Sequence, residues 1–192
     1  IEIAGLKTDG DTGLGDTSLA FAIWPYSNRE TKTYFGVAGY AVLPTGSYDH
    51  NRLFNMGENR YKTALQAGYQ RQITTAASWM MAVDGVFYGD NHDYLPSKSD
   101  LKQDNLYTLQ TGLKYDFNSQ YSLMGTYFYS VGGRTEVDGV NKHDLTQLHR
   151  YQLSAQGNYS FGRLTLQYGS DIKTENGYLE DHRLIMRYTT YF

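Results

Sequence analysis

Histidine and acidic side chains stand close together at several points of the sequence, a pairing typical of acid–base chemistry. Asp49 precedes His50, and Asp90 and Asp93 flank His92. Further pairs are His143-Asp144 and Asp181-His182. A carboxylate can orient an imidazole so that it activates water, as at the external rim of outer-membrane proteases. These residues therefore raise two hypotheses: a hydrolase with its active site at the rim, or polar loop residues that are simply exposed to solvent.

The same residues give a weaker signal for metal binding. The run from Asp90 to Asp93 alternates oxygen ligands of the kind that calcium prefers, but the EF-hand spacing with its later glutamate is absent. We therefore expect no dedicated metal site and no cofactor, and at most cation contacts shared with lipopolysaccharide.

The segments that flank these residues alternate between apolar and polar side chains with period two. In residues 150–161 the odd positions carry Tyr, Leu, Ala, Gly and Phe, and the even positions carry Arg, Gln, Ser and Asn. A strand places the two rows on opposite faces. The same alternation predicts strands at 17–26, 33–43, 60–73, 77–88, 105–117, 120–131, 148–161, 163–175 and 181–192. Each is long enough to cross a bilayer at a tilt, for which about nine to eleven residues suffice.

The connections between these segments differ in length in a regular way. Short turns are expected at 27–32, 74–76, 118–119 and 162, and long loops at 44–59, 89–104 and 132–147. Short periplasmic turns and long external loops are typical of outer-membrane barrels. The Asn176-Gly177 pair predicts a tight turn before the last strand. Every histidine lies in or beside a predicted external loop, so the loops alone explain why histidines cluster at one end. We therefore favour the interpretation that these residues are solvated polar loop residues over a hydrolase site.

Composition supports a membrane barrel and excludes other classes. The chain has 192 residues with 19 Tyr, 8 Phe and 2 Trp, and many of these aromatic residues lie near strand ends, where they suit the membrane interfaces. No apolar stretch approaches the roughly 18 residues of a spanning helix. A net charge of -3 argues against nucleic acid, and the absence of cysteine suits a periplasmic folding route. The predicted periplasmic girdle comprises Trp24, Tyr26, Trp79, Tyr115, Phe117, Tyr121, Phe161 and Phe192.

The polar rows predict which side chains face the lumen. A charge on the lipid face would cost about 2–4 kcal/mol near the midplane, so charged positions should point inward. The predicted lumen residues are Lys62, Gln66, Gln70, Asp84, Lys114, Asp116, Arg150, Gln152, Gln156, Arg163, Gln167, Asp171, Lys173, Arg183 and Arg187. Two interpretations remain open: a polar channel whose charges set selectivity, or a plugged lumen whose charges pair with one another.

Within this set, spacing indicates finer roles. Lys114 with Asp116, and Asp171 with Lys173, stand two apart and could bridge to neighbouring strands. Arg150, Arg183 and Arg187 would make the C-terminal wall cationic, which would favour anionic solutes such as carboxylates.

Nine strands are an awkward number, because bacterial single-chain barrels use an even number and leave no edge unpaired. The prediction is therefore either a ten-stranded barrel or a chain that lacks N-terminal strands. If the last strand descends to the periplasm, a further ascending strand must precede residue 17, and residues 1–6 could be its end.

Several phrases of the sequence together resemble one known family. They are Gly15-Asp16-Thr17, Phe35-Gly36 through Leu43-Pro44-Thr45-Gly46, Asn55-Met56-Gly57-Glu58-Asn59-Arg60, Tyr88-Gly89-Asp90-Asn91, Val137-Asp138-Gly139-Val140 and Glu175-Asn176-Gly177 with Glu180-Asp181-His182-Arg183. In this order they resemble the outer-membrane channel family named for the MetA pathway of phenol degradation. The resemblance implies a barrel of about twelve strands that helps hydrophobic or aromatic catabolic substrates to cross the outer membrane.

The sequence thus predicts an all-β, antiparallel, up-and-down transmembrane barrel, a single domain over residues 1–192 in the bacterial outer membrane. The expected function is passive uptake of small molecules without enzymatic activity; the alternatives are a rim-active hydrolase or a purely structural barrel. Expected partners are outer-membrane lipid, lipopolysaccharide and small solutes. Oligomeric state, natural substrate and the choice between a luminal exit and a lateral exit near Gly36, Gly39 and Gly85 stay open.

Overall fold

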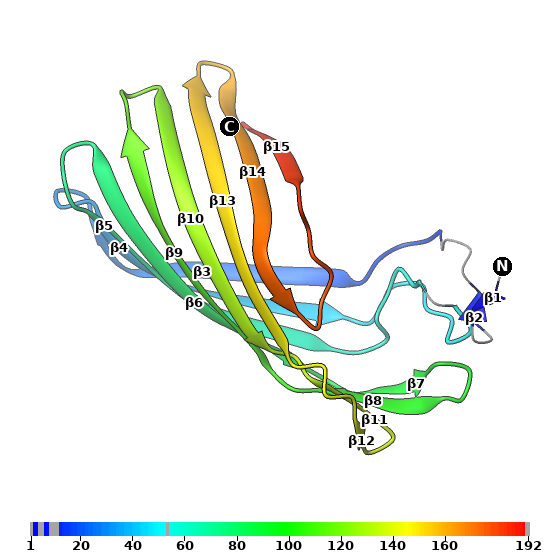
Figure 1. The fold of residues 1–192 in the computed structure, drawn as a ribbon. Coiled ribbons are helices and arrows are strands. Elements are labelled where there is room, and N and C mark those ends of the chain that lie inside the picture. The colour runs from blue at the N-terminus through cyan, green and yellow to red at the C-terminus, as the bar shows by residue number, and fades with distance from the viewer. Residues whose placement is uncertain (1, 4–5, 8–11, 53, 191–192) are drawn as a thin grey trace.

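The chain folds into one large, strongly curved β-sheet with smaller sheets at its loop end (Figure 1). The computed structural model describes residues 2–3, 6–7, 12–52 and 54–190. The large sheet has nine strands. They are β3 (Thr17–Asn28), β4 (Thr33–Leu43), β5 (Lys62–Gln72), β6 (Ala77–Tyr88), β9 (Leu106–Asp116), β10 (Tyr121–Gly132), β13 (Thr146–Tyr159), β14 (Gly162–Glu175) and β15 (Arg183–Thr189). All nine were predicted from the alternation, with ends that shift by a few residues.

Each strand of the large sheet pairs with its neighbours in an antiparallel, up-and-down order. The order is β15-β14-β13-β10-β9-β6-β5-β4-β3. Among the described residues, β3 and β15 form the two edges and do not pair with each other, so the sheet is not closed. Within the described part of the chain, no helix has the length and apolar character needed to span a bilayer.

Strand register shows which side chains share a face, because directly opposed residues point to the same side of a sheet. One such row crosses eight strands. It runs Arg183, Gly169, Gln152, Thr126, Gly112, Met80, Gln70 and Tyr34. One cavity is lined by residues of both β4 and β15, at opposite ends of this row, so this face is the concave one.

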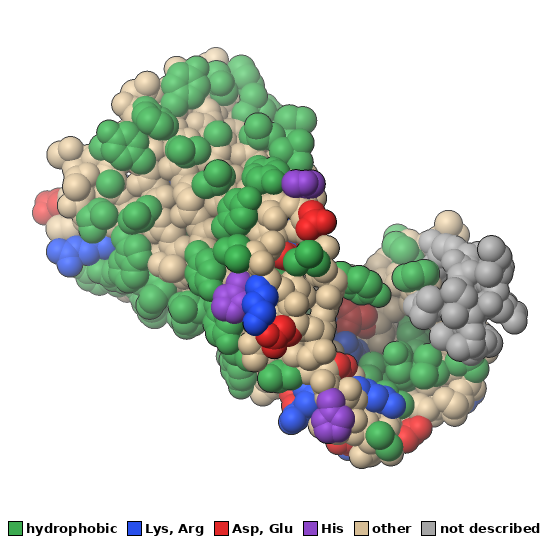
Figure 2. Space-filling view, in the orientation of Figure 1, with side chains coloured by type: hydrophobic (Ala, Val, Ile, Leu, Met, Phe, Trp, Pro, Cys, Tyr) green, Lys and Arg blue, Asp and Glu red, His purple; other side chains and the backbone are tan. Residues whose placement is uncertain are grey.

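The convex face is apolar. Leu153 on β13, Leu166 on β14 and Met186 on β15 are all largely exposed there. Hydrophobic side chains cover much of the strand region in Figure 2, whereas charged side chains gather towards the loop end. An exposed apolar area that extends over most strands of a sheet is typical of a lipid-facing surface rather than a water-facing one.

Aromatic rings gather on the convex face beside the short turns. Tyr115 and Phe117 pack edge to face with centroids 5.1 Å apart, and Tyr159 stacks on Phe161 at 5.1 Å. Tyr121 packs against Tyr159 at 6.3 Å. Further girdle members are Tyr26, which pairs in register with the convex-facing Phe35, and Trp79, which packs against Tyr69. Phe192, the last predicted girdle residue, lies outside the described residues.

Trp24 does not belong to this girdle, which corrects the prediction. The β3–β4 register shifts between Ile23 and Tyr26, in a segment that contains Pro25, and proline has no N–H to donate to a sheet ladder. Trp24 keeps the concave orientation of Ala22, two residues before it, whereas Tyr26, after the shift, faces the convex side. The Trp24 indole lies 3.3 Å from the position that a Cβ would take at Gly36, so the absence of a side chain there makes room for the ring.

Two of the segments predicted as long loops contain further strands. They are β7 (Asn91–Tyr94), β8 (Ser99–Gln103), β11 (Thr135–Val137) and β12 (Val140–Asn141), which form a separate four-stranded sheet in the order β12-β11-β8-β7. These strands extend the two hairpins beyond the large sheet at the loop end (Figure 1). Residues 89–104 and 132–147 are therefore structured extensions rather than irregular loops.

Two smaller predictions were also wrong. The segment that was to end an ascending strand instead contains β1 (Glu2–Ile3) and β2 (Leu6–Lys7), which pair with each other in a sheet of their own. Asn176-Gly177 does not form a tight two-residue turn: β14 ends at Glu175 and β15 begins at Arg183. Asn176 has a φ of 52° and its side-chain amide donates to the Leu145 carbonyl, so it anchors a longer connection.

Candidate functional site: the concave face

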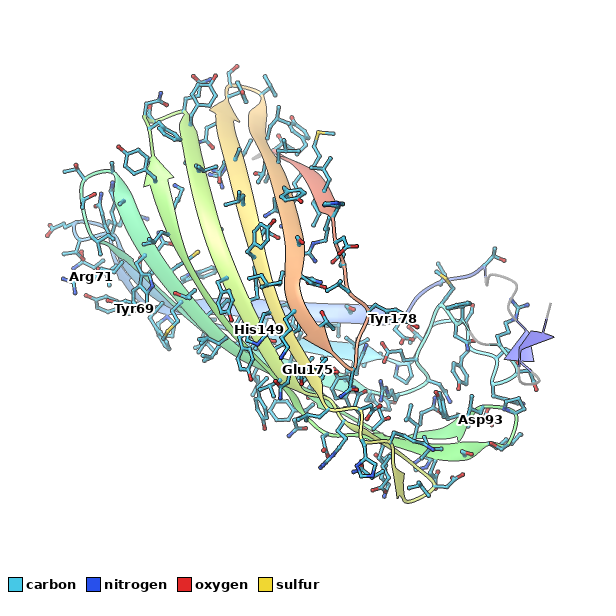
Figure 3. The ribbon with its side chains drawn as sticks, viewed as in Figure 1. Tyr69, Arg71, Asp93, His149, Glu175 and Tyr178 are labelled. Carbon is cyan, nitrogen blue, oxygen red and sulfur yellow. The ribbon has the colours of Figure 1, made fainter. Side chains whose placement is uncertain are left out.

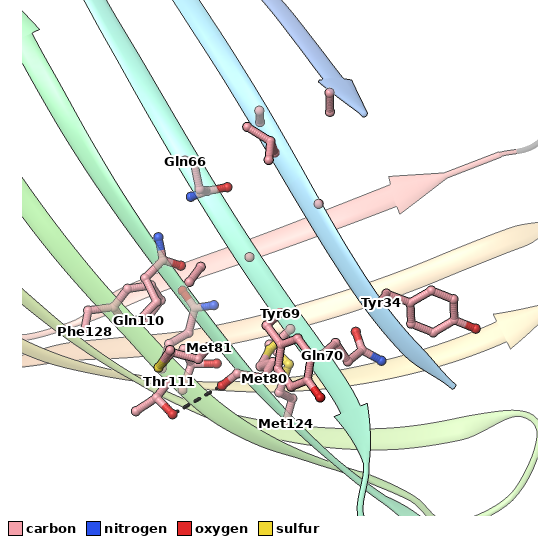
Figure 4. A pocket seen from close by; sticks show the side chains of 18 of the residues that line it. Tyr34, Gln66, Tyr69, Gln70, Met80, Met81, Gln110, Thr111, Met124 and Phe128 are labelled. Carbon is pink, nitrogen blue, oxygen red and sulfur yellow. Dashed lines mark hydrogen bonds between the residues drawn. The ribbon is translucent and has the colours of Figure 1, made fainter. Parts of the chain in front are cut away.

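The concave face encloses a cavity of about 650 Å³, shown from close by in Figure 4. Residues of β3, β4, β5, β6, β9, β10, β13, β14 and β15 line it, so the cavity depends on the curvature of the whole sheet. This volume lies within the range of small-molecule binding sites, which is roughly 300–1,000 Å³.

The lining of the cavity combines amides, rings and two cations. Its amide side chains are Gln66, Gln70, Gln110, Gln152 and Gln167. Concave positions also contribute Trp24, Tyr34, Phe128, Met80 and Met124. Among the described residues, the only charged side chains in the lining are Arg183 and Arg187, and no carboxylate lines the cavity.

The structure places fourteen of the fifteen predicted lumen residues on the concave face by register, and brings six of them into the cavity. The six are Gln66, Gln70, Gln152, Gln167, Arg183 and Arg187. The remaining eight lie on the same face outside the cavity lining. They are Lys62, Asp84, Lys114, Asp116, Arg150, Gln156, Arg163 and Asp171.

Lys173 is the exception and corrects the prediction. Asp171 pairs in register with Arg150, but Lys173 pairs with His149, so Ile172 is an extra residue in a β-bulge. The bulge shifts the side-chain alternation, and Lys173 points to the convex side, where it pairs with Glu175 at 2.5 Å. His149 and Glu175 lie close together in Figure 3. Asp171 and Lys173 therefore do not share a face.

Asp84 illustrates how the concave face compensates a charge without a cation. Gln110 donates from Nε2 to Asp84 Oδ1 at 2.9 Å, and Gln66 donates to the same oxygen at 3.4 Å. Both amides thereby turn one donor toward the carboxylate. Gln66 and Gln110 also line the cavity, whereas Asp84 does not. Asp84 therefore orients two polar side chains of the cavity wall from outside the lining.

A buried ionic network lies between β13, β14 and the segment before β15. Arg150 donates from Nε to Asp171 Oδ1 at 2.6 Å, and its NH2 lies 2.8 Å from Glu180 Oε2. The Asp171 side chain is fully buried, and Oδ2 accepts a hydrogen bond from the Glu180 backbone at 2.8 Å. Glu180 was placed in a loop by the sequence reasoning, yet it completes this network and lies 3.8 Å from Arg183.

A second ion pair lies near the short turns. Lys114 Nζ is 2.6 Å from Asp116 Oδ1, so the two residues pair with each other within β9 rather than with a neighbouring strand as predicted. Both side chains are partly exposed, so the pair is a surface contact of modest energy. The concave face thus contains both paired charges and, at Arg187, a cation for which the described residues provide no ion pair.

The loop between β4 and β5, residues 44–61, is held above the large sheet by polar anchors that sequence reasoning did not single out. Asp16 accepts hydrogen bonds from the Gly46 backbone at 2.8 Å and from the Glu58 backbone at 2.9 Å. Asn91 on β7 is 1% exposed, and its amide donates to Tyr48 Oη and to the Glu58 carbonyl. The sequence signal for these roles is that Asp16, Gly46, Glu58 and Asn91 all fall within the family-like phrases.

Electrostatics reinforce this loop at Glu58. Burial opposes ionisation of its carboxyl group, but hydrogen bonds from Lys62 and Arg60 outweigh that effect and lower the pKa of Glu58. Arg60 also donates to Gln103 at 2.7 Å, and its guanidinium lies 4.8 Å from the ring centre of Tyr88. The loop is therefore tied to both β6 and β8.

The histidine and acidic pairs are spread over the loop end. His50 Nδ1 lies 3.0 Å from Asp93 Oδ2, and His92 Nδ1 lies 2.6 Å from Asp100 Oδ1. Figure 3 shows Asp93 in the loop region, far from Tyr69 and Arg71 at the short-turn end. Both pairs include a residue of β7, yet each consists of one histidine and one carboxylate, and within the described ranges no group of three or more such residues could hold a metal ion.

Two pairs remain, His143-Asp144 and Asp181-His182. In these pairs Asp144 and His182 interact with residues other than their sequence neighbours. Asp144 accepts hydrogen bonds from the backbone and hydroxyl of Thr135 at 2.7 and 2.5 Å. His182 Nδ1 lies 2.9 Å from Tyr168 Oη on the convex side. These contacts secure local structure at the loop end.

Comparisons with known proteins agree with this geometry. The profile of a family described as "Putative MetA-pathway of phenol degradation" matches residues 1–188. A crystal structure of an outer membrane channel from Pseudomonas putida F1 superposes with a TM-score of 0.89 at 29% sequence identity. The match covers 95% of this chain and 68% of that one. Among curated proteins, no sequence matches the chain.

These findings bear out the predicted class, location and absence of enzymatic activity. The matched structure is described as an outer membrane channel, and its superposition shows that this chain shares its fold. The chain is an outer-membrane channel protein, and it belongs to the MetA-pathway of phenol degradation family.

Proposed function

We propose that the protein provides a passive route by which small hydrophobic or aromatic molecules cross the outer membrane. The observation that carries this proposal is the cavity on the concave face, where rings and thioethers stand among uncharged amides. Apolar parts of a solute can contact Trp24, Phe128 and Met124, while its polar groups exchange water for glutamine side chains. No bond is broken, and flux follows the concentration gradient.

Two features of the concave face support an open, conducting interior rather than a filled one. The charges that face one another at Arg150, Asp171 and Glu180 are close to the wall and satisfied there. The cavity itself is lined by uncharged amide side chains, such as those of Gln70 and Gln110. Charges fixed on the wall and amides facing open space are what a permeation path requires.

A groove on the convex face favours a second route for apolar solutes. It has a volume of about 460 Å³ and is lined mainly by apolar residues of β5, β6, β9 and β10. Gly85 lies in it beneath the ring of Tyr107, whereas Gly39 is covered by Phe21. A solute that reached this groove would pass into the lipid directly.

Lipid is the partner that the convex face fits. Its apolar side chains suit acyl chains, and the aromatic girdle suits the headgroup level. At the loop end, Lys173 and His149 offer contacts to lipopolysaccharide phosphates on the same face.

A matched pair of substitutions tests the permeation path. Gln66→Trp adds a ring inside the cavity, whereas Leu65→Trp adds the same ring to the lipid side of the adjacent position. In planar bilayers we expect Gln66→Trp to lower single-channel conductance severalfold and Leu65→Trp to leave it unchanged. Equal conductance of both variants and the parent would show that solutes do not pass through this cavity.

A further inference from the structure

One wall of the cavity contains polar groups that have no partner among the described residues. We propose that this wall, formed by β10, β13, β14 and β15, binds hydroxylated aromatic carboxylates, with Arg187 holding the carboxylate and Gln167 Oε1 accepting a hydrogen bond from the hydroxyl. This proposal rests on the proposed function, since it names the solute class of the same cavity.

Gln167 supplies the unsatisfied acceptor. Its side chain is 9% exposed, and its Nε2 donates to Ser154 Oγ at 3.1 Å. Its Oε1 is buried and has no hydrogen-bond partner among the described residues. A buried acceptor without a donor is costly, whereas a ligand hydroxyl would satisfy it. Thr126 also lines the cavity, and its Oγ1 is buried and has no hydrogen-bond partner among the described residues.

Arg187 supplies the available positive charge. Arg183, the other cation of the lining, lies 3.8 Å from Glu180 and donates to Gln152 at 3.3 Å, so it is partly compensated. Arg187 has no ion pair or hydrogen bond to the described residues and stands beside Thr165. A lining with two arginines and no carboxylate attracts an anion.

Strand register fixes the spacing of these two groups. Gln167 lies opposite Ile185, and Arg187 is two residues further along β15 on the same face. Such diagonal neighbours are about 7–8 Å apart at the backbone. A single aromatic ring with a hydroxyl at one end and a carboxylate at the other can therefore reach both groups.

The rest of the cavity suits the ring itself. Met124 lies in the same register row as Ser154 and Gln167, and Phe128 and Trp24 also line the cavity. Thioethers and aromatic faces make favourable contacts with a flat apolar ring. An aliphatic acid would gain the arginine contact without these ring contacts.

The experiment combines three probes with two variants, because each variant removes one contact. The probes are 4-hydroxybenzoate, benzoate and phenol, and their binding to the purified protein in detergent is measured by isothermal titration calorimetry. The variants are Arg187→Gln and the near-isosteric Gln167→Met. Lys114→Gln is the matched control, since it removes a cation from the same face outside the cavity. Heat-modifiable migration on gels shows that each variant is folded.

The proposal predicts a specific pattern. Arg187→Gln should weaken 4-hydroxybenzoate and benzoate about tenfold, because a hydrogen bond to a charged group is among the stronger kinds, and should leave phenol unchanged. Gln167→Met should weaken 4-hydroxybenzoate and phenol about threefold to tenfold and leave benzoate unchanged. Lys114→Gln should change none of the three.

Other outcomes would overturn the assignment. If both variants weaken all three probes equally, the effect is structural, and if neither changes binding, the wall is not the site. Conductance in planar bilayers, recorded on the same preparations, separates this failure from failure of the proposed function. A channel that conducts but shows no probe pattern refutes the carboxylate site alone, whereas a folded protein that never conducts refutes the channel.

Discussion

Replacing Asp171 by asparagine should destabilise the folded protein more than any other removal of a single carboxylate on the concave face. The change keeps the shape of the side chain and removes its charge. Asp171 is fully buried, accepts from Arg150 Nε at 2.6 Å and accepts from the Glu180 backbone at 2.8 Å. Arg150 is only 19% exposed, so water cannot fully replace the lost partner.

The expected loss of unfolding free energy depends on the interactions that Arg150 retains in the variant. Breaking a buried ion pair by removing one partner generally costs about 3–5 kcal/mol, because the remaining charge is uncompensated. Glu180 Oε2 stays 2.8 Å from the same guanidinium and retains part of the compensation. We therefore expect the lower end, about 3 kcal/mol of unfolding free energy.

The assay is equilibrium unfolding in phospholipid vesicles, with urea as denaturant because it does not screen charges. Cold gel migration and tryptophan fluorescence report the folded fraction. Glu175→Gln is the matched control: it breaks the exposed Lys173–Glu175 pair on the convex face and should cost about 0–1 kcal/mol. If Asp171→Asn is as mild as this control, the buried network does not stabilise the wall of the cavity.

Three further outcomes are expected. Leu166→Arg, on the lipid face, should cost about 2–4 kcal/mol in the same assay, whereas Thr165→Arg, one residue away on the concave face, should cost far less; equal costs would reverse our assignment of the two faces. Gly46→Val should loosen the 44–61 loop and speed its proteolysis, because a Cβ there would lie 2.8 Å from Asp16; unchanged proteolysis would contradict this contact. Glu58 has its pKa lowered in the folded state, since two basic neighbours outweigh the effect of burial. The stabilisation that ionised Glu58 gives the loop should be complete above the unfolded pKa of about 4.3 and lost as the pH falls through the lower folded pKa. Proteolysis of the loop should therefore speed up over this pH range in the parent protein, and a Glu58→Gln variant should not show this pH dependence.

The sequence predicts the sheet well because its signal is repeated along every strand. Alternation in residues 150–161 defines two faces without reference to any other strand, and the length pattern of the connections defines the two ends. The resulting lumen assignments depend only on parity within a strand, which a regular ladder preserves.

The errors lie where parity is interrupted. The β3–β4 register shift beside Pro25 put Tyr26 on the convex face while Trp24 stayed concave, and the bulge at Ile172 moved Lys173 to the convex face. A proline in a strand is a visible warning, but Ile172 carries no sequence signal for a bulge. Partners that meet through the fold, such as Glu180 with Arg150, cannot be paired from spacing within one strand.

Ion selectivity is the most direct test of the claim that solutes pass along the concave face. Arg187→Glu reverses a charge in the cavity lining, and Arg71→Glu reverses one at an exposed position near the short turns. The reversal potential is measured in planar bilayers across a potassium chloride gradient. We predict that Arg187→Glu shifts it toward cation preference and that Arg71→Glu does not. An unchanged reversal potential for Arg187→Glu in an open channel would show that current does not pass along this face.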